Sequence, residues 1–336
     1  MTLLADPATA QRPLDVICLG RAGVDLYAHD TDRSFSEVTS FAKYVGGSPA
    51  NIAAAVAKLG GKVGFIGCVS ADGLGRYVCD YLRQIGVDLQ GMKTLSGGVR
   101  TSLAITEMRA ERPEVVIYRN HAADLALKPA DIDEAYIASA RLLLVSGTAL
   151  CASPSREATL LAMDYAQHHG TQVVLDMDYR AYSWESQEAP TIYYNLAAGK
   201  SQMIIGNREE FDVLEYLGDK ASSDQEIARR YLGGPTEIVI IKDGENGSTT
   251  YTRQHHFTQG VFPAQVQKPF GAGDAFAGSL MFALLREYSL EQAVAMGSAA
   301  AALNVSGTSC SEAMPNFLQL RQFMAEHGYP LPPLPI

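Results

Sequence analysis

Residues 268–278 read Lys-Pro-Phe-Gly-Ala-Gly-Asp-Ala-Phe-Ala-Gly, and an apolar run follows directly. The small residues permit a tight turn whose backbone N–H groups point the same way, and a helix that starts there adds its positive N-terminal end. This combination is typical of an anion-binding loop, which we call the anion loop and define as Gly271, Ala272 and Gly273. Asp274 follows it, so its carboxylate would stand beside the bound anion and could accept a proton from an attacking hydroxyl. Alternatively, Asp274 caps the helix N-terminus and stabilises it by about 1 kcal/mol.

A glycine pair opens a second informative stretch far upstream. Residues 46–60 read Gly-Gly-Ser-Pro-Ala-Asn-Ile-Ala-Ala-Ala-Val-Ala-Lys-Leu-Gly, an Ala-rich helix pattern with Asn51 in its first turn. Together the two stretches resemble the paired signatures of the ribokinase-like (phosphofructokinase-B type) carbohydrate kinases, and the resemblance extends over roughly residues 14–325. It implies that Gly47 and Asn51 contact a sugar, that the anion loop is the oxyanion hole, and that Asp274 is the base.

Two other phosphate-binding motifs do not match. The dinucleotide fingerprint Gly-x-Gly-x-x-Gly follows a strand, but residues 265–269 are a poor strand, and four residues separate Gly273 from Gly278 where the fingerprint has two. The Walker motif needs Ser or Thr after Gly-Lys, whereas Lys62 is followed by Val63. The sequence therefore disfavours a nicotinamide enzyme and excludes a Walker-type nucleotide site.

The composition is that of a metabolic enzyme. A chain of 336 residues with 47% hydrophobic content can bury a large core, which predicts one large domain with a small appendage. We expect a kinase domain at 14–325 with terminal tails at 1–13 and 326–336. The net charge of −10 comes without a basic stripe, so neither nucleic acid nor an anionic membrane is an expected partner.

The cysteines and the N-terminal segment indicate a cytoplasmic protein. An odd count of five cysteines without a Cys-x-x-Cys pair suggests neither a disulfide framework nor a zinc site, so they are interpreted as buried thiols in a reducing compartment. Residues 1–13 lack the pattern of a signal peptide, and no charge-free run of 18 apolar residues occurs.

Short apolar runs alternate with helical patterns along the chain. Continuous runs of this kind predict strands of a parallel sheet that is covered on both faces. The expected fold class is therefore α/β, a doubly wound, mostly parallel sheet with helices on both faces. The runs lie at residues 15–19, 63–67, 142–146, 173–176, 203–206 and 238–241.

Two segments, residues 24–44 and 97–119, break this alternation. Within the second, residues 100–106 and 115–119 have the composition of antiparallel strands. The family resemblance implies that the two segments form a small β-sheet lid over the sugar site. Because such a sheet would expose edges and apolar side chains, we also expect a homodimer joined lid to lid.

Asn207 and Glu210 follow the apolar run that ends at Gly206. They match the family's Asn-x-x-Glu motif, which implies that they organise Mg²⁺ and its waters around the phosphates of ATP, with Asn207 also touching the nucleotide. The alternative is a helix N-cap with its capping-box Glu, and both roles are compatible.

The segment 242–248 ends the next apolar run with two glycines. Its place in the chain matches a family loop along the nucleotide, which implies that Lys242, Gly244 and Gly247 bind ATP together with Gly273. The alternative is an ordinary hairpin turn. Asn304, after the Ala-rich residues 299–303, is assigned to the adenine pocket, with a plain core helix as the alternative.

Candidate sugar-binding residues follow the first apolar run. Asp25 matches the family's Asp that accepts hydrogen bonds from sugar hydroxyls. Arg21 stands where the family often has an acidic or amide side chain, and a cation there suggests an anionic sugar. Arg119 and Arg180 match positions at which sugar-acid kinases bring arginines to a carboxylate, which suits the planar guanidinium fork, and Asp178 in the same turn as Arg180 is also assigned to substrate binding. For each arginine, the alternative is a surface salt bridge worth less than about 1 kcal/mol.

The chain departs from the family pattern just before the anion loop. Most members carry Asp-Thr there, whereas this chain has Lys268-Pro269-Phe270. A monovalent-cation site that depends on that Asp is therefore in doubt, and Lys268 could partly replace the cation's charge.

Four segments together resemble the branch of the family that phosphorylates 5-dehydro-2-deoxy-D-gluconate on its terminal (C6) hydroxyl in myo-inositol breakdown, with ATP and Mg²⁺. The alternatives are a kinase of 2-keto-3-deoxygluconate or of fructose, and a sugar-acid sensor without catalysis. The intact Asp274 and Asn-x-x-Glu set argue against the sensor. The segments are residues 20–28, 175–180, 206–211 and 268–274.

Overall fold

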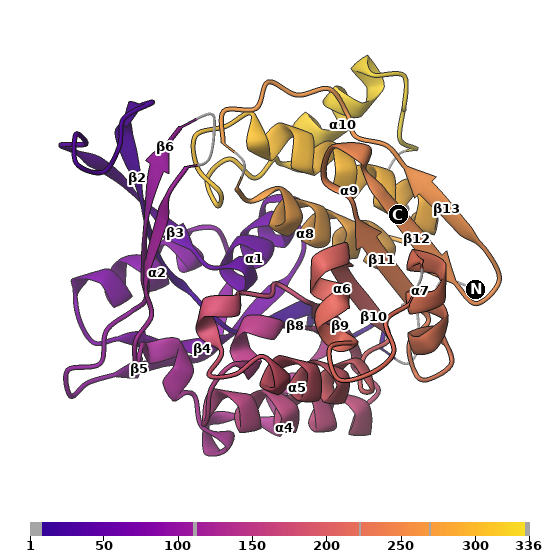
Figure 1. Cartoon of the computed structure of the whole chain (residues 1–336), viewed down its shortest axis with the longest axis horizontal. Coiled ribbons are helices and arrows are strands. Elements are labelled where there is room, and N and C mark those ends of the chain that lie inside the picture. The colour runs from indigo at the N-terminus through magenta and orange to yellow at the C-terminus, as the bar shows by residue number, and fades with distance from the viewer. Residues whose placement is uncertain (1–8, 110–112, 222, 269, 333–336) are drawn as a thin grey trace.

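The computed structural model describes residues 9–109, 113–221, 223–268 and 270–332. Pro269, part of the predicted lid and the outer parts of both predicted tails lie outside the described residues. The described chain folds into a large layered α/β unit with a small sheet beside it, at the left of Figure 1.

The large sheet has nine strands in the described part of the chain, and the seven from β11 to β5 are parallel. The last two strands in chain order, β12 and β13, add an antiparallel hairpin at one edge. In spatial order the strands are β13 (His256–Gln259), β12 (Ser248–Thr252), β11 (Ile238–Lys242), β10 (Met203–Asn207), β9 (Gln172–Asp176), β8 (Ala140–Ser146), β1 (Leu14–Leu19), β4 (Val63–Ser70) and β5 (Asp88–Leu95).

The central strands are apolar on both faces because helices cover both. In β1, Val16 and Cys18 join a core cluster with α1, α8 and α9, whereas Ile17 and Leu19 join a second cluster with α3, α4 and α5. Successive side chains of a strand point to opposite faces, which explains this division. The helices are α1 (Ser48–Lys58), α2 (Gly73–Gln84), α3 (Glu134–Ala138), α4 (Ser155–His168), α5 (Glu188–Ala198), α6 (Arg208–Leu214), α7 (Asp224–Leu232), α8 (Ala272–Leu285), α9 (Leu290–Val305) and α10 (Phe317–Glu326).

The small sheet consists of segments that are far apart in the sequence. Its middle strands run parallel and each edge strand is antiparallel to its neighbour. In spatial order the strands are β3 (Phe41–Gly46), β2 (Gly23–Thr31), β6 (Leu103–Met108) and β7 (Val115–Tyr118). The predicted fold class and the separate small sheet are confirmed.

Some details differ from the prediction. The strand expected at 100–106 begins at Leu103 instead, and the half-exposed strand β5 was not predicted because it has no continuous apolar run. The small sheet was expected to expose apolar side chains, but Val24 on β2 is fully buried in a core cluster of the chain. Among the described residues, no helix has the length and apolar character needed to cross a bilayer.

Candidate active site

A cavity of about 530 Å³ lies where the carboxyl ends of the parallel strands meet the small sheet. Ligand sites of open α/β sheets occur at this edge. The predicted site residues that line the cavity are Arg21, Asp25, Gly47, Asn51, Arg119, Asp178, Arg180, Asn207, Glu210, Lys242, Gly271, Ala272, Gly273 and Asp274. Gly244, Gly247 and Asn304 are not part of its lining.

The anion loop forms the start of α8. Gly271 is the N-cap residue with a left-handed φ of 86°, and a Cβ there would lie 2.6 Å from Asn304 Oδ1, so glycine is required for both reasons. The helix begins at Ala272, and the first N–H groups of a helix have no partner within it. Asp274 is the third helical residue, which corrects the alternative that it is the cap.

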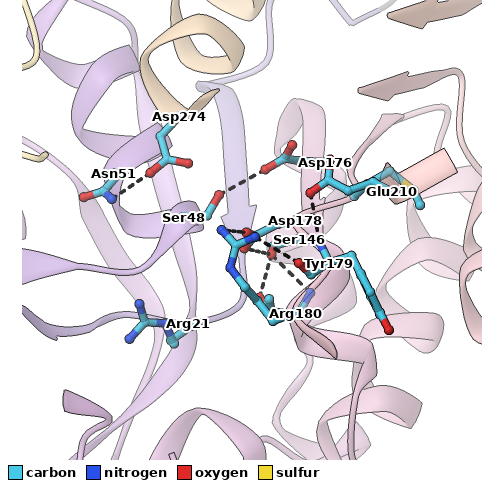
Figure 2. Close-up of polar contacts among 12 residues, drawn as sticks. Arg21, Ser48, Asn51, Ser146, Asp176, Asp178, Tyr179, Arg180, Glu210 and Asp274 are labelled. Atoms are coloured by element: carbon cyan, nitrogen blue, oxygen red, sulfur yellow. Dashed lines mark hydrogen bonds and ion pairs between the residues drawn. The ribbon is translucent and has the colours of Figure 1, made fainter. Parts of the chain in front are cut away.

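Asp274 faces Asn51 across the contact between α8 and α1 (Figure 2). A Cβ at Gly278 would lie 2.6 Å from the Ala55 Cβ, so this glycine lets the two helices pack closely. The close packing brings Asn51 Nδ2 to 2.7 Å from Asp274 Oδ2, to which it donates a hydrogen bond. The two predicted signatures are thus in direct contact.

Burial raises the pKa of Asp274 to about 6, with a further contribution from the Asp178 charge. The hydrogen bond from Asn51 acts in the opposite direction, as does the positive charge of Lys242. A carboxylate with a raised pKa is a stronger base, and it is still ionised at neutral pH.

The pKa of Asp274 predicts how kcat/KM falls at acid pH. Because the base must be ionised and its pKa is about 6, we expect kcat/KM to fall roughly tenfold per pH unit below about pH 6 and to be level above pH 7. Steady-state ADP release between pH 5 and 8 measures this fall. The residual turnover of Asp274→Asn should lack it, and a wild-type profile that stays level down to pH 5 would contradict the role of Asp274 as base.

Asp176 is a site residue that the sequence analysis left out. It ends β9, is 3% exposed, and accepts a hydrogen bond from Ser48 Oγ at 3.0 Å (Figure 2). Lys242 Nζ lies 3.8 Å from Asp176 Oδ1. Burial raises the pKa of Asp176. The sequence did contain a signal for Asp176, because it is an acidic residue at the end of an apolar run that predicts a strand.

Lys242 lies between the acidic groups and the anion loop. A Cβ at Gly273 would lie 3.2 Å from Lys242 Nζ, so the ammonium reaches the loop. Burial acts to lower the pKa of Lys242, but Asp176 and the other carboxylates of the site together raise it. The ammonium is therefore charged at neutral pH and faces the place where the anion loop would hold a phosphate.

Asn207 and Glu210 form the capping box that was the alternative interpretation. Asn207 Oδ1 accepts from the Glu210 N–H at 2.8 Å, and Glu210 Oε2 accepts from the Asn207 N–H at 2.8 Å. Glu210 Oε1 also accepts from the Tyr179 N–H at 3.1 Å (Figure 2). These bonds fix the carboxylate at the cavity wall, where each oxygen has a second lone pair for a metal-bound water.

The loop after β11 is a hairpin turn, which was the alternative interpretation of residues 242–248. It contains a short 3₁₀ turn at Gly244–Asn246 and leads into the antiparallel strand β12. Lys242 at its start lines the cavity, whereas Gly244 and Gly247 lie further along the hairpin.

The assignment of Asn304 to an adenine pocket needs correction. Its side chain is fully buried and accepts a hydrogen bond from Lys268 Nζ at 2.8 Å, while Nδ2 donates to the Cys310 carbonyl at 2.8 Å. Both ends of the amide are thus engaged inside the protein. Asn304 instead supports the anion loop from the protein interior, because Oδ1 packs against Gly271.

On the sugar side, Asp25 is buried and lines the cavity. Asp25 Oδ1 has no hydrogen-bond partner among the described residues, and Tyr27 Oη donates to Oδ2 at 3.3 Å. A Cβ at Gly46 would lie about 2.0 Å from Asp25 Oδ1, so the first glycine of the pair makes room for this carboxylate. Burial raises the pKa of Asp25, and the Arg21 charge opposes the rise.

The three candidate arginines differ in how far they are already engaged. Arg119 donates twice to Asp124 Oδ2, at 2.6 and 2.8 Å, and once to the Thr148 carbonyl. Arg180 pairs with Asp178 at 2.7 Å and is half exposed. Arg21 donates to the Ser102 hydroxyl at 3.2 Å and lies 4.0 Å from Asp25, so it keeps the most unused donors.

The fold and this site are those of a carbohydrate kinase. The model of the pfkB family carbohydrate kinases matches residues 14–316, and the chain belongs to this family.

Known relatives agree with this assignment. The chain is 54% identical over 306 residues to the 5-dehydro-2-deoxygluconokinase of Photobacterium profundum, covering 90% of this chain and 92% of the relative. It is 46% identical over 323 residues to the 5-dehydro-2-deoxygluconokinase of Geobacillus kaustophilus, covering 96% of each. A putative ribokinase II from E. coli, solved in complex with ATP and Mg²⁺, has a TM-score of 0.85 at 21% identity over 94% of this chain and 100% of that chain, which shows the shared fold.

Proposed function

We propose that this chain transfers the γ-phosphoryl group of ATP to the terminal (C6) hydroxyl of 5-dehydro-2-deoxy-D-gluconate, a step of myo-inositol catabolism. The observation that supports this most strongly is that one cavity is lined by the Asp274 carboxylate, the anion loop and Arg21, whose guanidinium keeps unused donors. The names of the two relatives, at 54% and 46% identity, support the choice of sugar acid.

In the proposed reaction the acceptor hydroxyl lies against Asp274, which takes its proton as the oxygen attacks. Asn51 keeps the carboxylate oriented through its 2.7 Å hydrogen bond. The anion loop N–H groups and the Lys242 ammonium stabilise the negative charge on the transferred group. Each such donor is typically worth about 3 kcal/mol in the transition state.

The cavity wall also offers the oxygen donors that Mg²⁺ prefers. Glu210 and Asn207 would hold the ion through its waters, and the buried Asp176 Oδ1, which has no hydrogen-bond partner among the described residues, faces the same region. When bound, Mg²⁺ would neutralise charge on the ATP phosphates.

The substrate carboxylate is assigned to Arg21, with Arg180 as the second cation. Arg119 lines the cavity but is bound to Asp124, so its part is to shape the wall. Asp25 Oδ1, which accepts no hydrogen bond from the described residues, would accept one from a substrate hydroxyl.

A coupled ADP-release assay over a panel of sugars tests the assignment. The panel contains 5-dehydro-2-deoxy-D-gluconate, 2-keto-3-deoxygluconate and fructose. The expected result is the highest kcat/KM for the first of these. A higher value for either of the others would replace the proposed acceptor, and ADP release with none of them would refute it.

The small sheet is expected to protect the reaction from water. Ala104, Thr106, Val115 and Ile117 line the cavity from β6 and β7, and water at the γ-phosphate would hydrolyse ATP. Amide hydrogen exchange in residues 24–44 and 97–119 should therefore slow when the sugar acid binds, more than exchange in the core strands β8 and β9. Equal changes in the two regions would contradict the lid role.

We also propose a homodimer joined through the small sheets. The edge strand β7 exposes Tyr118 by 59% and Val115 by 37%. Solution mass at micromolar concentration should be twice the chain mass of 36.1 kDa, and Tyr118→Asp should lower it to one chain. Leu318→Asp on α10, where the native side chain is 73% exposed, is the matched control and should stay dimeric. A monomeric wild type would refute the proposal.

A further inference from the structure

Lys268 is a buried cation directly behind the anion loop. Its side chain is 1% exposed, although a lysine is almost never buried without partners. Its Nζ donates to the Phe270 carbonyl at 2.6 Å and to Asn304 Oδ1 at 2.8 Å. No carboxylate of the described chain lies within ion-pair distance of it.

The two acceptors connect Lys268 to the shape of the anion loop. Phe270 immediately precedes Gly271, and Asn304 Oδ1 would be 2.6 Å from a Cβ at Gly271. Asn304 is itself fixed, because Nδ2 donates to the Cys310 carbonyl at 2.8 Å. The ammonium thus bonds the residue before the loop and the amide beneath it, and so restrains the loop's left-handed start.

These surroundings are also unsuited to a bound alkali cation. Carbonyl and amide oxygens are the ligands that such an ion would use, and here an ammonium already occupies them. A second positive charge beside Nζ would be repelled. The residues present therefore do not fit a monovalent-cation site at this position.

We propose that the Lys268 ammonium acts as a built-in monovalent cation that positions the anion loop, so that phosphoryl transfer by this chain needs no potassium ion. Lys268 is a positioning residue: it acts through the loop and does not line the cavity. The proposal depends on the kinase activity of the chain, whichever sugar acid is the acceptor.

The first test uses the wild-type protein and needs no variant. Turnover is measured with Tris salts of ATP and acceptor, at constant ionic strength, in potassium, sodium or tetramethylammonium chloride. The expected kcat agrees within about twofold among the three salts. A rise of tenfold or more in potassium would overturn the proposal.

The second test removes the cation. Lys268→Met is expected to lose about tenfold or more in kcat, since a misplaced loop no longer faces the transferred group, while KM for the sugar acid changes little. Potassium or ammonium chloride should restore part of the loss, which a purely structural defect would not allow. The matched control is Lys58→Met, because Lys58 also donates to a backbone carbonyl, that of Glu312 at 2.6 Å, at the far end of α1.

A folded Lys268→Met variant with wild-type kcat would overturn the proposal, and so would a loss of kcat that no cation restores. If the variant does not fold, Lys268→Arg replaces it and should retain more kcat than Lys268→Gln. Calorimetry of MgADP binding separates this proposal from the acceptor assignment, because it needs no sugar acid. Wild-type affinity should be equal in potassium and tetramethylammonium, and tighter binding in potassium would count against a built-in cation.

Discussion

Asp274→Asn is expected to lose at least about 10²-fold in kcat while it keeps its fold and its affinity for the sugar acid. The amide has the size of the carboxylate and can still accept the hydrogen bond from Asn51, so the contact between α1 and α8 is preserved. The anion loop is unchanged as well. What is lost is the group that takes the proton of the attacking hydroxyl. Steady-state ADP release gives kcat and KM, and thermal unfolding reports on the fold.

A matched control separates this effect from a general effect of Asp-to-Asn replacement. Asp80→Asn lies on α2, where the native side chain is 74% exposed and pairs with Arg83, and its kinetics should be those of the wild type. If Asp274→Asn turned over near the wild-type rate, Asp274 could not be the general base. A loss of kcat with a large drop in melting temperature would instead assign it a structural role.

The choice between base and helix cap could not be made from residues 268–278 by themselves. Where the helix starts depends on Gly271, which has a left-handed φ of 86° and no room for a Cβ beside Asn304. The partner of Asp274 is Asn51, 223 positions away. No local pattern reports a contact at that separation, and the family resemblance indicated only that the two signatures serve the same site.

The large sheet was more predictable than the site. Strands such as β8 and β11 are covered on both faces, so each is a continuous apolar run that the sequence displays directly. The edge strands β5 and β13 are half exposed and carry polar residues, so nothing in their composition separates them from loops. A strand of this sheet is therefore easier to predict from the sequence when both of its faces are buried.

Side-chain roles were less predictable because each depends on what else a group can reach. In the sequence, Arg119 and Arg21 look equivalent as cations near the sugar site. In the structure, Arg119 forms a close ion pair with Asp124 at 2.6 Å, whereas Arg21 lies 4.0 Å from Asp25. Asn304 follows an Ala-rich segment that suits an adenine pocket, but Lys268 and Cys310 take up its amide. Such competition between partners is decided by tertiary packing alone.

Arg21 is the residue that is expected to determine substrate choice. Arg21→Ala should weaken the use of the sugar acid far more than the use of a neutral ketose. The native side chain is 15% exposed, has one hydrogen bond, at 3.2 Å, and lies 4.0 Å from Asp25, so it is largely desolvated and keeps unused donors. Breaking a desolvated charge pair typically costs about 2–5 kcal/mol, which corresponds to a loss of about 30-fold to several thousandfold.

The measurement is kcat/KM for the sugar acid and for fructose, with each protein assayed on both. Arg21→Lys should recover part of the loss, because it restores the charge without the planar fork that binds both carboxylate oxygens. Arg33→Ala is the charge-matched control, since Arg33 pairs with Glu37 on the surface and its side chain is 60% exposed. Equal losses on acid and neutral sugar would make Arg21 a structural residue. Arg180, whose side chain is half exposed and pairs with Asp178 at 2.7 Å, would then be the next candidate for the carboxylate, because Arg119 cannot leave Asp124 without stranding a buried charge.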